Sequence, residues 1–549
     1  MRKHSAAILQ KNPYTAPEVQ CLPVQAPIGG WDALSPLAAM PPTNAVTLQN
    51  WVPRTGFVEL RKGYQPGVQG LVGSPIETLM TYRPPASSER LFAGGGGSIW
   101  EVTTEGSATV QQTGITNTRW QYINFTPSGG SHYLFAVNGG NDSPLLFDGT
   151  TWSNPSITGV SPGSLININV HKRRIWFIQN QSTSAWYLGT DSISGAATQL
   201  DVGALMPKGG YLVAMATWTI DGGLGPDDYA VFISSRGEAV IYKGTNPSDA
   251  TVWSLVGTFT FPPPLGRRCY FDMGSDVWLI TLQGIIPMSQ GLPFDPSADR
   301  SVAVTNKIQN AMLQSAQLYQ NNFGWQVLTY PAQGLAILNV PLATNSSQIQ
   351  YVMNLLTGAW CQFSGWNANT FEIFNDQLYF GDNNGNVNLA WSGAADLVSP
   401  IVADMKCAFN YFGDPGRNKR VTMVQPFIVS SGLITPTIAI DVNFSDNSPA
   451  APVTQITPTG GVWDSSKWDS GTWGGDTVVL VNWLSAEAQG QALAIRMKVN
   501  VGPSTIASSS VFDTGLFDTM VFDAFSGTYS DAALQVNAFN VLVEYGANV

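Results

Sequence analysis

The sequence predicts an all-β fold built around a β-propeller, and three observations point to it. The 549 residues include 55 Gly and 35 Pro, which favour tight turns, and 18 Trp, 17 Tyr and 25 Phe, which favour strands. From residue 70 onward, short apolar runs alternate with Gly, Asn, Asp or Pro. Paired runs return roughly every forty to fifty residues, which is the spacing of propeller blades.

The first seventy residues differ from the rest of the chain. A chain of this length is too long for one hydrophobic core, so we expect two to four domains. Residues 1–70 are Pro-rich and irregular, and we interpret them as an N-terminal arm that carries a few strands. Within this arm, Val46 to Trp51 fits either a strand or a short helix.

Residues 71–395 contain the repeated pattern of an apolar strand, a Gly/Asn turn and a second apolar strand. The pattern predicts a propeller of six or seven degenerate blades. Gly94 to Gly97 is interpreted as a hairpin turn, because no helix and no Lys-Ser/Thr pair follows it as a phosphate-binding loop requires. The predicted hairpins pair 91–93 with 98–102, 133–137 with 145–147, 174–178 with 185–189, 229–233 with 239–242, 277–280 with 284–287, and 377–381 with 386–387.

One helix interrupts the β pattern. Thr305 is a candidate N-cap for a helix over 305–321. One face of that helix carries Ile308, Met312, Ser315 and Tyr319, with Ala311 and Leu318 beside them. We expect it to pack on the side of the propeller.

Residues 396–549 are predicted to form a further β-rich domain, which adds a β-sandwich or platform region to the propeller. Pro436 to Val442 and Leu534 to Val543 alternate apolar and polar side chains, as half-buried strands do. Two tracts, 463–473 and 512–523, repeat an aromatic residue and Asp with a period of five. This period matches neither a helix nor a flat strand, so we expect successive tight turns with Asp side chains bonding backbone amides.

Charge and cysteine content exclude several classes of protein. Only 11% of the residues are charged and the net charge is −11, which argues against a sequence-reading DNA binder. Cys21, Cys269, Cys361 and Cys407 lie far apart and do not cluster with His, so we expect free, mostly buried thiols rather than disulfides or a zinc site. No apolar run is long enough for a membrane span, and the first ten residues do not form a signal peptide.

The sequence carries no recognisable catalytic apparatus, and we predict that the protein is not an enzyme and needs no cofactor or metal. Its three His residues lie outside any nucleophile motif, and the nucleophile elbow, the Walker loop and the zinc-protease helix are missing. Residues 147–152 partly resemble a sialidase box but lack its leading Ser and its repetition. Residues 382–386 lack the downstream Glu that a calcium loop requires.

Small groups of basic residues and one aromatic tract are the candidate contact sites. Each basic group is interpreted as a solvated turn or an intersubunit ion-pair site, with contact to DNA phosphates in a channel as the alternative. The DNA-channel or interface candidates are Lys172, Arg173, Arg174, Arg417, Lys419 and Arg420, and Arg267-Arg268 forms a further such pair. Trp463, Trp468 and Trp473 form a candidate exposed aromatic tract.

The segment Gly29 to Tyr64 resembles a known family. It reads GGWDALSPLAAMPPTNAVTLQNWVPRTGFVELRKGY, with a Met-Pro-Pro turn, a Leu-x-Asn-Trp-x-Pro-Arg stretch and Arg-Lys-Gly-Tyr. This pattern is similar to the N-terminal signature of tail nozzle proteins (tail tubular protein B) of podoviruses, the short-tailed bacteriophages. Residues 306–331 and 354–387 resemble the helix-plus-propeller region of the same proteins, and the resemblance weakens beyond residue 400.

The resemblance implies a structural virion protein, synthesised in the bacterial host cytoplasm and located in the phage tail. It implies a homo-hexameric nozzle that conducts and retains genomic DNA before ejection, with a propeller outside and a platform of N- and C-terminal strands. The implied partners are the tail adaptor ring, tail fibre or spike proteins, the host cell surface, and viral double-stranded DNA that passes without sequence specificity. A receptor- or glycan-binding tail protein, with Trp463 to Trp473 as stacking platforms, remains the alternative.

Overall fold

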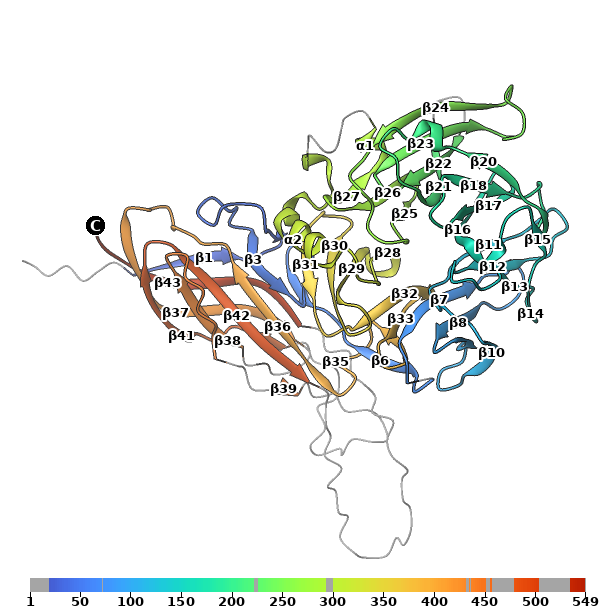
Figure 1. The fold of residues 1–549 in the computed structure, drawn as a ribbon. Coiled ribbons are helices and arrows are strands. Elements are labelled where there is room, and N and C mark those ends of the chain that lie inside the picture. The colour runs from blue at the N-terminus through green and yellow to red at the C-terminus, as the bar shows by residue number, and fades with distance from the viewer. Residues whose placement is uncertain are drawn as a thin grey trace, which may run out of the picture.

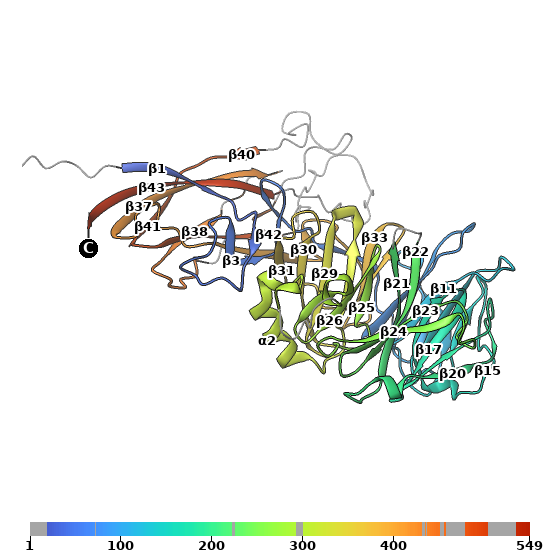
Figure 2. The ribbon, with the colours of Figure 1, turned by 90° about the horizontal axis from the view of Figure 1, so that it is seen from above.

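The computed structural model describes residues 19–71, 73–221, 226–292, 300–430, 434, 436–450, 455–456, 478–502 and 534–548. It is an all-β protein with two lobes, a β-propeller and a β-sandwich that we call the platform (Figure 1). Seen from above, the platform extends from one side of the propeller (Figure 2). The predicted fold class is confirmed.

Within the described residues the propeller has seven blades, each an antiparallel sheet. In strand order they are β7 (Ile76–Tyr82), β8 (Arg90–Gly95), β9 (Ser98–Glu101), β10 (Thr109–Thr113); β11 (Gln121–Phe125), β12 (Tyr133–Val137), β13 (Leu145–Phe147), β14 (Trp152–Ser153); β16 (Leu165–His171), β17 (Arg174–Gln179), β18 (Ser184–Tyr187), β20 (Thr198–Asp201); β21 (Leu212–Asp221), β22 (Pro226–Ser234), β23 (Glu238–Gly244), β24 (Trp253–Thr260); β25 (Tyr270–Met273), β26 (Asp276–Thr281), β27 (Gly284–Pro287); β28 (Gln326–Tyr330), β29 (Leu335–Ala343), β30 (Ser347–Asn354), β31 (Trp360–Phe363); and β32 (Ala368–Phe374), β33 (Gln377–Asp382), β34 (Val387–Ala390), β6 (Tyr64–Val68).

All six predicted hairpins are present; five are the two middle strands of a four-stranded blade, and the sixth is β26–β27 of the three-stranded fifth blade. Gly96 and Gly97 form the β8–β9 turn with φ of 57° and 74°, a conformation that glycine adopts without strain. The hairpin β29–β30 of the sixth blade completes the count and was not among the predicted hairpins. Beside the blades, β15 (Ile157–Thr158) and β19 (Gly195–Ala196) form a short parallel pair.

Buried apolar clusters lie between consecutive blades and explain the continuous apolar runs of the middle strands. Phe92 and Phe147 meet between the first and second blades, with ring centroids 4.9 Å apart. Trp176 and Phe232 meet in the same way between the third and fourth blades. Because each blade is covered on both faces, strands such as β17 are apolar at nearly every position.

The ring closes through a strand from the N-terminal part of the chain. Strand β6 pairs antiparallel with β34, so the outermost strand of the last blade precedes the first blade in sequence. The propeller therefore begins at Tyr64, and the predicted boundary between 70 and 71 is wrong by the length of this strand. The physical reason is closure, since pairing of the two chain segments joins the last blade to the first.

The platform packs two sheets face to face and combines distant parts of the sequence. One sheet contains β1 (Val19–Gln25), β43 (Leu534–Asn548), β37 (Arg417–Ser430), β41 (Leu484–Gly490), β40 (Val478–Leu480), β5 (Val58–Leu60) and β4 (Trp51–Pro53). The other contains β2 (Gly30–Trp31), β3 (Asn44–Gln49), β35 (Ala395–Asp396), β36 (Ser399–Cys407), β42 (Leu493–Gly502), β38 (Thr437–Val442) and β39 (Gln455–Ile456). The hydrophobic core between the two platform sheets is continuous with the core of the sixth and seventh blades.

The helical segments of the described residues are short, and the two α-helices lie against the fifth and sixth blades. They are α1 (Met288–Gly291), α2 (Gln309–Tyr319) and the 3₁₀ turns at Pro162–Ser164, Gly203–Leu205, Arg300–Val302, Asn306–Ile308 and Pro331–Gln333. Helix α2 buries Met312, Ser315 and Ala316, but Leu318 is exposed. The predicted Thr305 cap is wrong: its Oγ1 accepts the backbone N–H of Ile285 on β27 instead.

A buried ion pair lies where the platform meets the propeller. Arg61 donates from both Nη atoms to the Asp396 carboxylate, at 2.8 and 2.6 Å, and its side chain has no exposed surface. Its remaining donors reach the Asn50 side chain and the carbonyl oxygens of Lys62 and Ser364. All five N–H donors of the guanidinium are thereby used. The resembling segment Gly29–Tyr64 thus supplies the joint between platform and propeller.

Candidate functional site

The first predicted basic group lies at the β16–β17 turn of the third blade, in the propeller (Figure 1). Lys172 and Arg173 occupy the turn with φ of 48° and 59°. Lys172 Nζ lies 2.7 Å from Asp228, and Arg173 Nη2 lies 2.6 Å from Asp191. Arg174 donates to the Leu188 carbonyl and to Asn246. Each cation therefore has an acceptor within its own chain.

The second predicted basic group lies on the platform, at the start of β37. Arg417 donates to the Gly546 carbonyl, while Arg420 lies 3.6 Å from Glu487 and 3.9 Å from Glu544. Lys419 is buried, and its ammonium donates to the carbonyl oxygens of Asp414, Arg417 and Gln491. The structure does not bring the two basic groups together, and contact with DNA or a neighbour stays a prediction for both.

The aromatic tract Trp463, Trp468 and Trp473 and the second five-residue tract, 512–523, lie outside the described residues. Their predicted roles stay predictions. The Asp-rich turn at 382–386 is described: Asp382 accepts the backbone N–H groups of Asn384 and Asn386. Across the described ranges, no group of three or more His, Cys, Asp or Glu side chains could hold a metal ion, and no helix there is long and apolar enough to cross a membrane.

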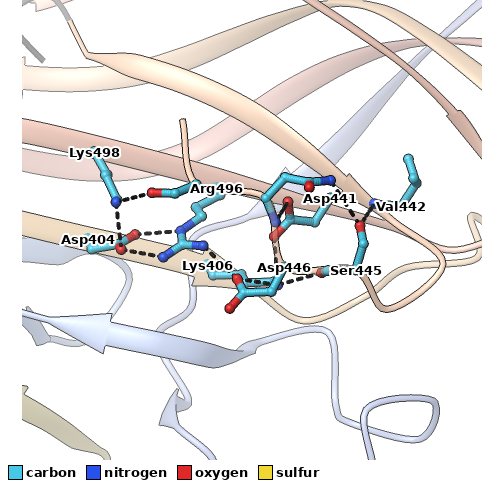
Figure 3. Close-up of polar contacts among 10 residues, drawn as sticks. Asp404, Lys406, Asp441, Val442, Ser445, Asp446, Arg496 and Lys498 are labelled. Carbon is cyan, nitrogen blue, oxygen red and sulfur yellow. Dashed lines mark hydrogen bonds and ion pairs between the residues drawn. The ribbon is translucent and has the colours of Figure 1, made fainter. Parts of the chain in front are cut away.

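A network of charged side chains covers the outer face of the second platform sheet (Figure 3). Arg496 on β42 forms a two-bond fork with Asp404 on β36, at 3.0 and 2.6 Å. Lys406 Nζ lies 2.6 Å from Asp441 on β38, and both side chains are buried. Lys406 and Arg496 also reach Asp446, and Lys406 lowers the pKa of that carboxyl.

Lys498, 3.5 Å from Asp404, completes a set of three cations and three carboxylates. The equal numbers of opposite charges leave no excess of positive charge for a phosphate backbone. We assign this network to holding the loop after β38 on the sheet.

The propeller axis holds the most unusual group of polar side chains. First strands of six blades line a cavity of about 250 Å³, which continues into a larger space at one end and a smaller one of about 190 Å³ at the other. Neighbouring spaces share lining residues, such as Tyr122 with the larger space and Trp120 with the smaller one.

The wider end of the axial cavity is acidic. Asp272, Glu372 and Asp376 line it together with Arg83. The Glu372 carboxylate accepts a hydrogen bond from Thr81 and lies 3.3 Å from Arg83 Nη2. Burial raises the pKa of Glu372 above its ordinary value.

The narrow end of the axial cavity is basic. Arg119, Arg267 and Arg268 line it, together with Trp120 and Phe323. Arg119 and Arg268 both lie over the Phe323 ring, at 4.2 and 5.3 Å from its centroid. Arg267 and Arg268 do not form a solvated turn, because both line the interior of the ring, and the intersubunit ion pair stays a prediction. Sequence reasoning missed the site since its residues come from different blades.

Comparisons with known proteins bear on the fold alone. No protein-family model matches the chain, and no curated protein matches it. Among solved structures, YCF48 from Cyanidioschyzon merolae is similar, with a TM-score of 0.35, 11% identity, and coverage of 60% of this chain and 98% of that one. YCF48 bound to D1 peptide gives a TM-score of 0.34 and 12% identity over 64% and 99%. BBS1N in complex with ARL6DN gives 0.26 and 13% over 43% and 72%.

Proposed function

We propose that this chain is a structural protein of a short bacteriophage tail. Six copies would form a nozzle ring that conducts and retains the genomic DNA before ejection into the host. The observation that carries the proposal is the segment Gly29–Tyr64, which resembles the signature of podovirus nozzle proteins. Its side chains form the joint between propeller and platform, which includes the buried Arg61–Asp396 pair.

Exposed apolar side chains on the platform support assembly with neighbours. Apolar surface that stays exposed on a single chain is a common mark of a protein interface. Trp483 is 36% exposed and Val479 is 59% exposed, at the edge of the first platform sheet. Further exposed apolar side chains of the platform are Val19, Val402, Phe444 and Val481. Contact with copies in a ring would remove this surface from water.

The charge of the protein supports passage of DNA rather than tight binding. The net charge is −11, so a channel wall formed by this chain would repel phosphates on average. The predicted basic groups already have acceptors within the chain, as described above. Weak, sequence-independent contact is the result that a conduit requires.

Native mass spectrometry of the purified chain, together with averaged images of tails that contain it, tests the proposal. A sixfold ring with an axial hole is the expected result. Trp483→Asp should weaken the ring, whereas Leu255→Asp, at a 44% exposed position on β24 of the propeller, should not. A stable monomer or trimer that binds host polysaccharide, and tails without a sixfold ring of this chain, would refute the nozzle and favour the receptor-binding alternative.

A further inference from the structure

The residues that line the basic end of the axial cavity carry an excess of positive charge. Three arginines line it, and no Asp or Glu does so among the described residues. Arg119 is the only one of the three with an ion pair in the described part of the chain, to Glu77 at 3.0 Å. The excess is unexpected in a protein whose net charge is −11.

Arg267 and Arg268 are held in place by neutral acceptors. Arg268 donates to the Glu77 carbonyl, to Thr78 Oγ1 and to Gln326. Arg267 donates from Nη1 to the Asn138 carbonyl at 2.8 Å, and this is the one hydrogen bond of its guanidinium to the described residues. These contacts fix the guanidinium groups without balancing their charge.

Keeping two cations partly out of water is unfavourable, and the attraction of Arg268 to the Glu372 and Glu77 carboxylates does not offset the cost of its burial. Burial lowers the pKa of Arg268 to about 10, which expresses the same cost. A bound anion removes this cost, and guanidinium groups match the oxygen pairs of phosphate and carboxylate. Drug-sized ligands occupy roughly 300–1,000 Å³, so a space of about 190 Å³ suits a single small group and excludes a DNA duplex.

We propose that the basic end of the axial cavity binds a small oxyanion, a phosphate or carboxylate group, through Arg267 and Arg268. The Phe323 ring, which lies against Arg119 and Arg268, positions the site. This inference does not depend on the proposed tail function. The anion is either a free ion or an acidic side chain of a neighbouring protein, since both present the same oxygen chemistry.

Isothermal titration calorimetry of the full chain, at constant ionic strength in chloride, tests the site. Inorganic phosphate represents the free ion and N-acetylglutamate represents an acidic side chain; the tighter of the two identifies the source. Arg267→Gln should weaken binding of that probe by about tenfold or more, because it removes one charged donor group. Arg236→Gln removes the same charge from an exposed turn of the fourth blade and should leave the affinity unchanged.

Absence of binding by the wild-type chain, or equal affinity in the wild type and Arg267→Gln, would overturn the proposal. If Arg267→Gln does not fold, as judged by circular dichroism, modification of wild-type Arg267 by phenylglyoxal decides. The tighter probe should then slow modification of Arg267 but not of Arg236. Equal rates with and without the probe would count against the site.

Discussion

Removal of Arg61 should destabilise the joint between the lobes more than removal of any exposed arginine. Arg61→Ala leaves the Asp396 carboxylate, 8% exposed, without its two-bond partner. It also removes the donors to Asn50 and Ser364 and the contact of the guanidinium with the Trp366 ring, at 5.2 Å. Breaking a buried pair from one side costs about 3–5 kcal/mol, since the remaining charge stays buried.

Urea titration followed by tryptophan fluorescence measures this cost as a change in the free energy of unfolding. The first unfolding transition is assigned to loss of the joint between the lobes. Arg420→Ala is the matched control. Its side chain is 52% exposed and its two carboxylates lie beyond 3.5 Å, so its loss should change the unfolding free energy by about 0.5 kcal/mol or less. Adding Asp396→Asn to Arg61→Ala should restore part of the stability, because it removes the uncompensated charge.

Two results would refute this reasoning. One is an unfolding free energy for Arg61→Ala within about 1 kcal/mol of the wild type, which is the range of an exposed pair. The other is a double variant that is less stable than Arg61→Ala alone.

Three further predictions concern titratable groups and thiols. Burial lowers the pKa of His171 to about 4, so the neutral ring contributes stability above pH 6.5 that is lost as the pH falls towards 4. His171→Gln should remove about 3 kcal/mol of this loss of stability in acid. Urea titrations at pH 6.5 and at pH 4 measure the difference. Because the pKa of Glu372 is raised above 4.5, the folded state loses stability as the pH rises past that value; the stability of Glu372→Gln relative to the wild type should therefore increase from pH 4.5 to 7, and a decrease would contradict this assignment. Burial raises the pKa of Cys269 and Cys407 to about 12 and also raises that of Cys361, whereas Cys21 is exposed. Ellman's reagent should therefore label one thiol in the native chain and four after denaturation.

Local sequence patterns determined the strands, the hairpins and the fold class. An apolar run, a turn with Gly or Asn and a second run specify a hairpin through contacts between neighbours in sequence. The hairpin of the sixth blade was not predicted; its first strand, β29, contains Pro341, and Pro within a run normally argues against a paired strand. In the structure the pairing register shifts next to Pro341, so the strand accommodates it.

Contacts between distant segments were decided only by the tertiary structure. Pairing of β6 with β34 and of β1 with β43 joins segments more than three hundred residues apart, and no local period encodes such a partner. Thr305 illustrates the same limit, since its hydroxyl is taken by Ile285 rather than by its own helix. The axial arginines look like an ordinary basic pair in the sequence. They become a candidate binding site only when seven blades close into a ring, because closure alone places side chains from different blades around one cavity.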